Sequence, residues 1–484
     1  MATRAAAAFR RSAIVAAVLS FVLPGLGHGW LGSFRRGLVL AMPVLVLVGF
    51  AIGTVAFQGK IRTLGLLVQP GVLVTLLVVN LALLIWRAAA IVDAYLLARR
   101  WSEPRSQSSD AAQRAIAMVV LSALLVTTLG MHAGLGFIGL KAYDTVTTVF
   151  ATQEPTATPS PSTAPPASQL PGEATPGPTS SPTQVPRWND DGRLDVLLVG
   201  GDSGPGRWSL RTDTMILLSV DVASGRAAMF GIPRNMRNVP LPPGPAAAFP
   251  ECDCFPDLLN SLYVFAGEHP ELFRGGEARG YLALQDAVGQ LVGRELDGTL
   301  VVTLNGFVRL VDALGGLEIT TPYSLYDATY PHEDGRHKEV IWIPAGHHHL
   351  DGHLALAFAR SRHQDTDYDR MYRQQLVVAS LRRQMCPGDL VMRIPELLDI
   401  ARDSLWTNVA IGDVPNLLAL GNRVSSDSIG RYQFWPPEIP QDLTDGGIAR
   451  IRQMVAGAFP PTAAAPGVSG SATASPSPAP ADSC

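Results

Sequence analysis

Acidic and basic residues stand where two apolar segments of this chain end and begin. The segment DVLLVGGD at 195–202 closes with Asp202, and the segment TDTMILLSVD at 212–221 follows Arg211 and contains Asp213. Apolar runs of this length beside glycine are typical of buried strands. Surface ion pairing is one explanation for the charges, but it adds little stability. The other is a site for a ligand that is both anionic and bound to a metal.

A hairpin joins the second of these segments to a third. The turn signal VASG separates TDTMILLSVD from RAAMFGIPRN at 226–235. Folding the hairpin about this turn brings Arg234 within a step or two of Asp213. Arg211 and Asp213 are two apart on a strand and share a face. We therefore expect Asp202, Arg211, Asp213 and Arg234 to converge at one edge of a sheet.

More arginines follow in the C-terminal half. The run HLALAFARSR at 353–362 contains Arg360 and Arg362, two residues apart and therefore expected to point the same way. From about residue 369 the periodicity predicts a helix, and its expected core stripe consists of Met371, Val378, Leu381 and Met385.

The start of this helix carries further candidate ligands. Arg370 and Gln374 are four residues apart and lie together off the core stripe, and Arg373 is one turn from Arg370. Asp367 stands at the expected N-cap, and a helix N-terminus is a natural site for an anion.

These residues together predict a diphosphate site. Clustered cations repel unless an anion lies among them, and guanidinium groups bind phosphate oxygens bidentately. Mg²⁺ or Mn²⁺ is held by one or two carboxylates plus substrate oxygens. The alternative for each residue alone is a solvated surface pair. The set comprises Arg211, Arg234, Arg360, Arg362, Arg370 and Arg373, with Asp202, Asp213 and Asp367.

The N-terminal part reads as a membrane region. We predict spans at about 37–57, 64–86 and 115–140, each near the roughly 20 residues that a crossing helix needs. The apolar stretch 12–34 is broken by PGLGHGWLG and is expected to be re-entrant or interfacial. Arginine-rich 87–114 should be cytoplasmic, which exports the chain after the third span and favours three crossings over four.

Composition divides the rest of the chain. A Pro/Thr/Ser-rich segment cannot bury a core and should form an extended spacer, and a similar Pro/Ala/Ser-rich tail ends the chain. The predicted organisation is a membrane part, a linker, one extracytoplasmic domain and a disordered tail, at 1–144, 145–190, 191–458 and 459–484.

Charge and cysteine content limit the remaining possibilities. The net charge of −3 and the absence of a basic patch give no indication of nucleic-acid binding. Of the four cysteines, Cys386 is a possible disulfide partner for Cys252 or Cys254 in an exported domain. The stretch HHHLDGH at 347–353 allows zinc binding by His349 and His353 if they are four apart on one helix, or else marks a loop.

Several motifs taken together resemble the LytR–CpsA–Psr family from about 193 to 385. They are LLVGGDS, RTDTMILLSVD, GIPRN, NSLY, VDALGGLEI, IPAGHHHLDGHLALAFARSR and DYDRMYRQQ, in this order. The resemblance implies an α/β domain with a central mixed sheet, flanking helices and an apolar pocket for a polyprenyl tail. It also implies transfer of a glycopolymer phosphate from undecaprenyl pyrophosphate onto peptidoglycan, with Mg²⁺ or a similar ion.

The same resemblance assigns roles by motif. Asp202 and Asp213 would bind the metal. Asp367 would orient the pyrophosphate ligands, which would be Arg211, Arg234, Arg360, Arg362, Arg370 and Gln374. Two other functions remain open at this point: hydrolysis of the polyprenyl pyrophosphate, and lipid binding without catalysis. A transcriptional role is disfavoured because an exported domain does not reach DNA.

Overall fold

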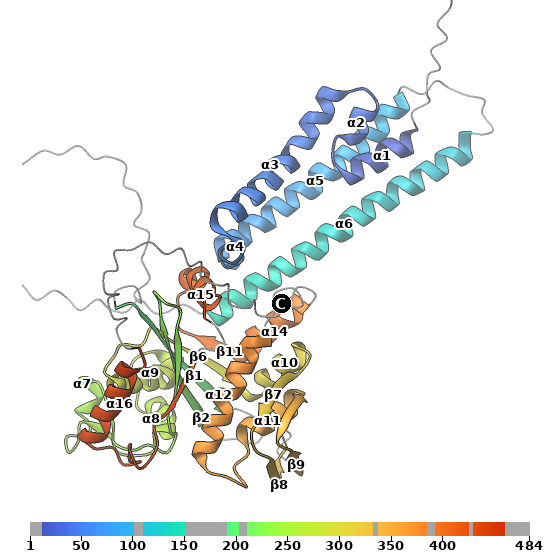
Figure 1. The fold of residues 1–484 in the computed structure, drawn as a ribbon. Helices are drawn as coiled ribbons and strands as arrows, with labels where there is room; N and C mark the ends of the chain where they lie inside the picture. Colours follow the sequence, from blue (N-terminus) through green and yellow to red (C-terminus); the bar gives the residue numbers. More distant parts are fainter. Residues whose placement is uncertain are drawn as a thin grey trace, which may run out of the picture. The chain divides into compact units, whose positions relative to one another are not determined.

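The computed structural model describes residues 12–100, 110–150, 191–202, 211–332, 337–384, 393–424 and 429–459. The chain divides into two compact units, one built mainly from the N-terminal helices and one from the α/β domain (Figure 1). The prediction of a mixed α/β domain preceded by apolar helices is confirmed.

The N-terminal unit contains three helices that are long and apolar enough to cross a membrane, Phe34–Gln58, Pro70–Arg100 and Arg114–Val149. This is the number that the arginine distribution predicts. The first apolar stretch instead forms two short helices, because Gly25 with φ of 92° turns the chain between them. The helices of the unit are α1 (Ala13–Val22), α2 (Leu26–Trp30), α3 (Phe34–Gln58), α4 (Lys60–Leu67), α5 (Pro70–Arg100) and α6 (Asp110–Val149).

A six-stranded sheet organises the α/β unit. Its order is β11-β6-β1-β2-β3-β12, with β1–β2, β2–β3 and β6–β11 antiparallel and β1–β6 and β3–β12 parallel. The predicted strands and the VASG hairpin are confirmed. The strands are β1 (Arg193–Asp202), β2 (Arg211–Asp221), β3 (Ala227–Gly231), β6 (Gly298–Thr303), β11 (Leu405–Thr407) and β12 (Gly430–Gln433).

The central strands alternate between two apolar layers. Leu197 and Leu217 point into the larger core, and Leu198 and Ile216 into a smaller one on the opposite face. This two-sided burial explains why the strands are apolar at nearly every position. The larger core is closed by α7 (Pro243–Ala246), α8 (Leu262–Glu268), α9 (Arg279–Val292) and α16 (Asp445–Gly457).

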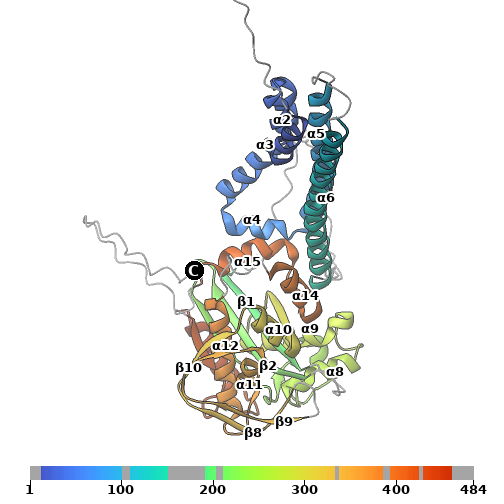
Figure 2. The ribbon, with the colours of Figure 1, turned by 90° about the vertical axis from the view of Figure 1, so that its right-hand side faces the viewer.

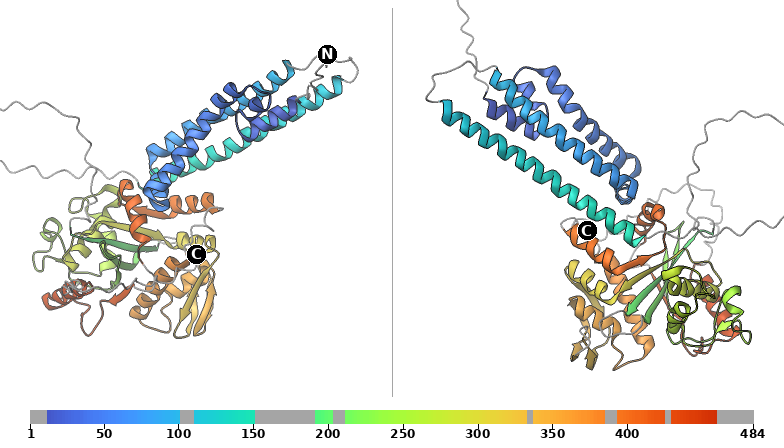
Figure 3. Two further views of the ribbon diagram at one scale, coloured as in Figure 1. Left: turned by 45° about the horizontal axis from the view of Figure 1, so that its top comes forward. Right: turned by 180° about the vertical axis from the view of Figure 1, so that it is seen from behind.

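The opposite face is covered by α12 (Asp367–Gln384), which contacts β2, β3 and β12. Seen from behind, the green strands lie between the orange helices and the yellow-green ones (Figure 3). The other described elements between these layers are β4 (Val239–Pro240), β5 (Cys254–Phe255), η2 (Leu259–Ser261), η3 (Gly276–Ala278), α14 (Ile394–Ser404) and η5 (Ile411–Asp413). They are followed by α15 (Val414–Gly421), whose residues Val414–Ala419 belong to the N-terminal unit.

A second core lies beside α12. It joins the buried side chains of two antiparallel strand pairs to three helices, one of which is α12. The strands β8 and β9 lie side by side (Figure 2), and β9 contacts α11. The VDALGGLEI motif lies here, where a helix is followed by a Gly-Gly turn and a strand. The elements are α10 (Leu304–Ala313), β7 (Leu317–Thr321), β8 (Leu325–Pro331), β9 (Lys338–Ile343), β10 (Gly346–Leu350) and α11 (Gly352–Arg360).

Two expectations about Cys and His residues were wrong. Cys252 is bonded to Cys254, so neither is available to Cys386, which lies outside the described residues. His349 and His353 are not four apart on one helix, because His349 belongs to strand β10 and His353 to helix α11.

Candidate functional site

The two central strands end together at one edge of the sheet. Asp202, the last residue of β1, pairs in register with Arg211, the first residue of β2. The backbone of an expected metal ligand therefore lies opposite that of an expected phosphate ligand. The predictions for the side chains of Asp202 and Arg211 lie outside what the structure describes.

A β-bulge interrupts the pairing just before this edge. Gly200 pairs with Thr214, whereas the next residue of β1 pairs with Thr212, which leaves Asp213 as the extra residue. Bulges re-aim side chains and are frequent beside active sites. The bulge also breaks the strand alternation from which we expected Arg211 and Asp213 to share a face. A Cβ on Gly200 would lie 2.9 Å from Cβ of Thr214, so the close pairing here requires glycine.

The hairpin brings Arg234 to Asp213, as its length predicts. Gly231 pairs with Ile216 in the ladder, and three residues further on Arg234 donates from Nη1 to Oδ1 of Asp213 at 2.6 Å. Asn260 reaches the same oxygen with Nδ2 at 3.4 Å, and its backbone N–H donates to the Arg234 carbonyl. Asp213 is thus held by a strand neighbour and by a distant loop.

The N-terminus of α12 differs from the expected arrangement. Thr366 is the N-cap, because its Oγ1 accepts from the Asp369 N–H at 3.3 Å. The Asp369 carboxylate in turn accepts from the backbone N–H of Thr366 at 3.0 Å and from its hydroxyl at 2.6 Å. This reciprocal pair is a capping box. The prediction of Asp367 as the N-cap was therefore wrong: it is the first helical residue, and its side chain is left for other partners.

Asp367 lies among three guanidinium groups. Its Oδ2 is 3.0 Å from Nη2 of Arg370 and 3.4 Å from Nε of Arg234, and its Oδ1 is 3.5 Å from Nη1 of Arg362. Arg370 is buried, with only 4% of its side chain exposed, whereas Arg362 is 49% exposed. The structure therefore brings Arg234 together with Arg362 and Arg370, which lie far from it in the sequence but close to each other.

Arg370 also joins the helix to the bulge. Its Nη2 donates to the backbone carbonyl of Asp213 at 3.2 Å, the residue that the bulge leaves out of the regular pairing. One turn later, Gln374 donates from Nε2 to Oγ1 of Thr214 at 2.8 Å and to the Ala359 carbonyl at 3.3 Å. These contacts fix the first turns of α12 against β2.

The charges at this edge favour an ionised Asp213. Burial opposes its ionisation, but the charge and hydrogen bond of Arg234 outweigh burial with help from Arg370 and Asn260, so its pKa lies below the ordinary value. Burial and the charge of Arg234 lower the pKa of Arg370, partly offset by Asp367. A guanidinium group nevertheless stays protonated in proteins. At neutral pH the site therefore holds the ionised Asp213 beside the guanidinium groups of Arg234 and Arg370.

Arg373 lies apart from this cluster. It is fully buried, with 0% of its side chain exposed. Its guanidinium nitrogens donate to the backbone carbonyls of Phe358 and Ser361 and to the carboxylate of Asp365. We therefore assign it the task of fixing the 358–365 segment to α12 and omit it from the anion ligands. The predicted core stripe is only partly right, because α12 buries Met371 together with polar side chains, and Met385 lies outside the described residues.

Arg360 and Arg362 contact different partners because the segment before them is a helix. Arg360 is the last residue of α11, and its guanidinium lies over the ring of Tyr330 at 5.9 Å. The backbone of Ser361 then becomes extended, which directs Arg362 to Asp367. The expectation that these arginines point the same way was wrong, since it applied strand alternation to a helix end.

Comparisons with known proteins identify the family of this chain. The family model described as LytR_cpsA_psr matches residues 158–438, more than half of the chain. This chain belongs to the LytR_cpsA_psr family. The matched range contains Asp213, Arg234 and Arg370 and both strands of the central hairpin.

Individual relatives of this family are distant. Biofilm regulatory protein A of Streptococcus mutans is 24% identical over 253 residues, 51% of this chain and 57% of the relative. The polyisoprenyl-teichoic acid–peptidoglycan teichoic acid transferase TagU of Halalkalibacterium halodurans is 26% identical over 220 residues, 45% of this chain and 62% of the relative. The chain thus spans about three-fifths of these relatives. The crystal structure of B. subtilis TagV matches with a TM-score of 0.40 and 20% identity, covering 55% of this chain and 96% of that one.

A metal ion of the kind expected for this family member fits the described part of the site. The hydrogen bonds that described residues donate to the Asp213 carboxylate reach Oδ1, and the side chain is 29% exposed. Oδ2 is therefore available to a cation, and the backbone of Asp202 lies at the same edge. Hard cations such as Mg²⁺ take carboxylate oxygens and complete their shell with water and phosphate oxygens.

The larger of the cavities described for this domain is not the expected apolar pocket. It measures about 740 Å³ and is lined partly by the charged side chains of Arg274, Asp286, Arg294, Glu295 and Arg452. None of the arginines around Asp367 lines it. The apolar pocket for a polyprenyl tail therefore stays a prediction.

Sequence reasoning missed two supporting residues. Asn260 belongs to the NSLY motif, but it lies 47 residues from its partner Asp213 across an irregular segment, and no periodicity connects the two. The role of Thr366 as N-cap could have been predicted, since a threonine three residues before an acid is typical of a capping box.

Proposed function

We propose that this chain transfers a glycopolymer phosphate from a polyprenyl (undecaprenyl) pyrophosphate carrier to peptidoglycan during cell-wall assembly. The observation that supports it best is the convergence of Arg234, Arg362 and Arg370 on Asp367, beside the ionised Asp213. Such a group of cations suits a compact anion with several oxygens. A relative whose name specifies a polyisoprenyl-teichoic acid donor and a peptidoglycan acceptor supports the same chemistry.

The arginines would bind the pyrophosphate of the carrier. Arg362, at 49% exposed, would meet the phosphate first, and Arg234 and Arg370 would bind it more deeply by exchanging part of their contact with Asp367 for phosphate oxygens. Guanidinium groups do this bidentately. Arg211, Arg360 and Gln374 are further proposed ligands, from the sheet edge, the end of α11 and the second turn of α12.

Asp202 and Asp213 would hold Mg²⁺ or Mn²⁺. When bound, the ion neutralises charge that develops on the phosphate oxygens. The bulge at Asp213 serves this role because it turns the carboxylate out of the regular strand alternation. Arg234 would keep Asp213 ionised and oriented through the 2.6 Å contact to Oδ1.

The reaction is a displacement at phosphorus. A sugar hydroxyl of peptidoglycan attacks the sugar-linked phosphorus of the carrier, a new P–O bond forms, and the bridging P–O bond to the lipid phosphate breaks. The negative charge that spreads over the transferred group and the leaving lipid phosphate is stabilised by the arginines, since phosphoryl transfer depends mainly on positioning and electrostatics. A base of the site or solvent takes the hydroxyl proton.

The proposed location follows from the helices and their flanking arginines. The three candidate spans anchor the chain, and the positive-inside rule puts the segment after the third span outside the membrane. The α/β domain would then meet both a lipid carrier and the wall.

Reconstituted protein tests the proposal directly. The full chain in lipid vesicles is given a polyprenyl-pyrophosphate-linked glycan and peptidoglycan fragments, with Mg²⁺ or with a chelator. We expect release of polyprenyl monophosphate together with glycan attached to peptidoglycan, and loss of both with the chelator. Lipid phosphate release without attachment would show a phosphatase, and binding without release would show a non-catalytic lipid-binding module.

A further inference from the structure

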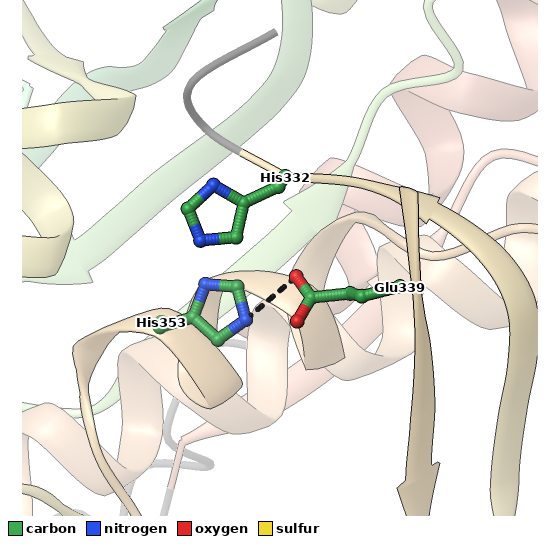
Figure 4. A group of neighbouring side chains, drawn as sticks. All are labelled: His332, Glu339 and His353. Atoms are coloured by element: carbon green, nitrogen blue, oxygen red, sulfur yellow. Dashed lines mark ion pairs between the residues drawn. The ribbon is translucent and has the colours of Figure 1, made fainter. Parts of the chain in front are cut away.

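One group of metal-binding side chains lies outside the site described above. It consists of His332, directly after β8, Glu339 in β9 and His353 in the first turn of α11. One possible ligand atom from each lies within 4.8 Å of the others. Figure 4 shows the imidazole rings of His332 and His353 and the Glu339 carboxylate turned toward one another.

The Glu339 carboxylate faces a ring nitrogen of His353. Nε2 of His353 lies 2.9 Å from Oε1 of Glu339. This oxygen is buried, and no described residue satisfies it with a hydrogen bond. A nitrogen and a carboxylate oxygen at this distance are placed to share a cation.

The third side chain closes the group. The rings of His332 and His353 are 5.2 Å apart, inclined by 33°. Tetrahedral Zn²⁺ holds His nitrogens at about 2.0–2.1 Å and carboxylate oxygens at about 2.0–2.2 Å, which sets its ligand atoms about 3.3 Å apart. Small side-chain rotations are enough to reach this spacing from atoms within 4.8 Å.

We propose that His332, Glu339 and His353 bind Zn²⁺. Two imidazoles and one carboxylate suit a borderline ion with nitrogen and oxygen ligands and leave one position for water. The exposed fractions of the His353 and Glu339 side chains, 26% and 33%, allow the ion to enter. This site is separate from the proposed magnesium site at Asp213, and the inference does not rest on the proposed function.

The zinc would join two elements that the sequence separates. His332 and Glu339 belong to the β8–β9 hairpin, whereas His353 belongs to α11. The ring of Tyr330 lies 6.1 Å from that of His353 and is also the ring under the Arg360 guanidinium, at 5.9 Å. An ion in this place therefore fixes the hairpin to the helix and, through Tyr330, fixes Arg360.

Zinc titration of the full chain in detergent micelles tests the site. Metal-free protein is titrated with ZnCl₂ in excess Mg²⁺, and Co²⁺ substitution reports a tetrahedral site through its visible absorption bands. We expect one Zn²⁺ per chain and a higher melting temperature with zinc. His353→Ala and Glu339→Gln should each weaken binding by at least about tenfold, and the tetrahedral cobalt spectrum should be lost.

A second His–Glu group supplies the matched control. Glu318 pairs with His347 at 2.9 Å and with His349 at 2.7 Å on the neighbouring strands β7 and β10. Glu318→Gln should leave the affinity and the spectrum unchanged. The proposal is overturned if the parent protein binds no zinc, or if Glu339→Gln, melting like the parent without metal, binds zinc as tightly. The proposal is also overturned if Glu318→Gln loses zinc binding while Glu339→Gln and His353→Ala keep it.

Discussion

At the residue scale, burial separates arginines that look alike in the sequence. Arg362 and Arg373 both follow the apolar run that ends near 360, and both contact an aspartate. One is half exposed beside Asp367, and the other is fully buried among backbone carbonyls. Their substitution should therefore have opposite consequences for stability and activity.

Arg362→Gln should leave the melting temperature within about 2 °C of the parent, since an exposed pair contributes about 0–1 kcal/mol. Its transfer rate should fall about 100-fold, as when one donor to a developing oxyanion is lost. Polyprenyl phosphate release by the vesicle-reconstituted protein measures this. A variant with the parent rate would remove Arg362 from the site.

Arg373→Gln should instead destabilise the domain by about 3–5 kcal/mol, because it leaves Asp365 and two carbonyls without their buried donor. The melting temperature should drop by roughly 10 °C. Thermal unfolding followed by tryptophan fluorescence provides the measurement. A stable variant that has lost only activity would show that Arg373 belongs with the anion ligands after all.

Asp213→Asn should lower the transfer rate by about 100- to 1000-fold, since it removes a charge that Arg234 and the proposed metal both require. Asp221→Asn is the matched control, because Asp221 lies at the other end of β2 and bonds only Ser224 among the contacts described for its carboxylate. Equal rates for the two variants would contradict the role of Asp213.

At the element scale, the N-cap of α12 also determines which partners are left to Asp367. Thr366 and Asp369 satisfy each other, and so leave the Asp367 carboxylate to the arginines. One contact between elements could be predicted from the sequence. Strand lengths and the VASG turn predicted the meeting of Arg234 with Asp213, because hairpin register follows from turn and strand period.

Other features depended on packing that the sequence does not display. Neither the bulge at Asp213 nor the helix that ends at Arg360 follows from strand period, and the contact from Asn260 reaches Asp213 across 47 residues. The predicted core stripe of α12 was only partly right because this helix also buries Gln374 and Arg373, which form hydrogen bonds. A pattern of apolar residues does not predict buried polar side chains.

Thr366→Ala should cost about 1 kcal/mol, lowering the melting temperature by about 2–4 °C, and should also reduce transfer activity, because the first turn of α12 holds Asp367. Thr303→Ala removes a comparable cap, whose side chain accepts from the Gly306 N–H at the start of α10. It should cost similar stability and preserve activity. If both variants lose activity alike, the effect is general destabilisation.

A half-buried carboxyl beside β1 should make stability depend on pH. Burial and the charges of Asp195 and Asp191 raise the pKa of Asp297 from 3.8 to about 6, while its Oδ2 accepts from the Asp195 N–H. Between these pH values the unfolded chain loses a proton that the folded chain keeps. The free energy of unfolding should therefore fall as pH rises through this window, by about 1–2 kcal/mol after solvent screening.

Asp297→Asn isolates this effect, since an amide oxygen can still accept from Asp195 but carries no titrating proton. Denaturant unfolding of parent and variant at several pH values between 3.8 and 6 gives the two slopes. We expect a shallower pH dependence in the variant. Parallel curves would mean that Asp297 titrates normally.

At the scale of the whole molecule, helices long and apolar enough to cross a membrane and an α/β domain belong to one chain. The helices Phe34–Gln58, Pro70–Arg100 and Arg114–Val149 are the candidate spans, and an odd number of crossings puts the two ends of the chain on opposite sides. This orientation is required for a donor lipid at the outer surface and an acceptor in the wall.

Cysteine labelling checks the topology. In a background with Cys386 and Cys484 replaced by serine, Gln58→Cys should react with a membrane-impermeant thiol reagent in intact cells, and Ser33→Cys should react only after lysis. The reason is that the first crossing helix separates the two positions. Reaction of both in intact cells would contradict three crossings with the α/β domain outside.

The most direct measurement is a structure of the full chain with a polyprenyl diphosphate and Mg²⁺ bound. We predict that diphosphate oxygens lie within hydrogen-bond distance of Arg234, Arg362 and Arg370, with the ion on Asp213. A diphosphate bound elsewhere on the domain, with these arginines still paired only to Asp213 and Asp367, would contradict the account.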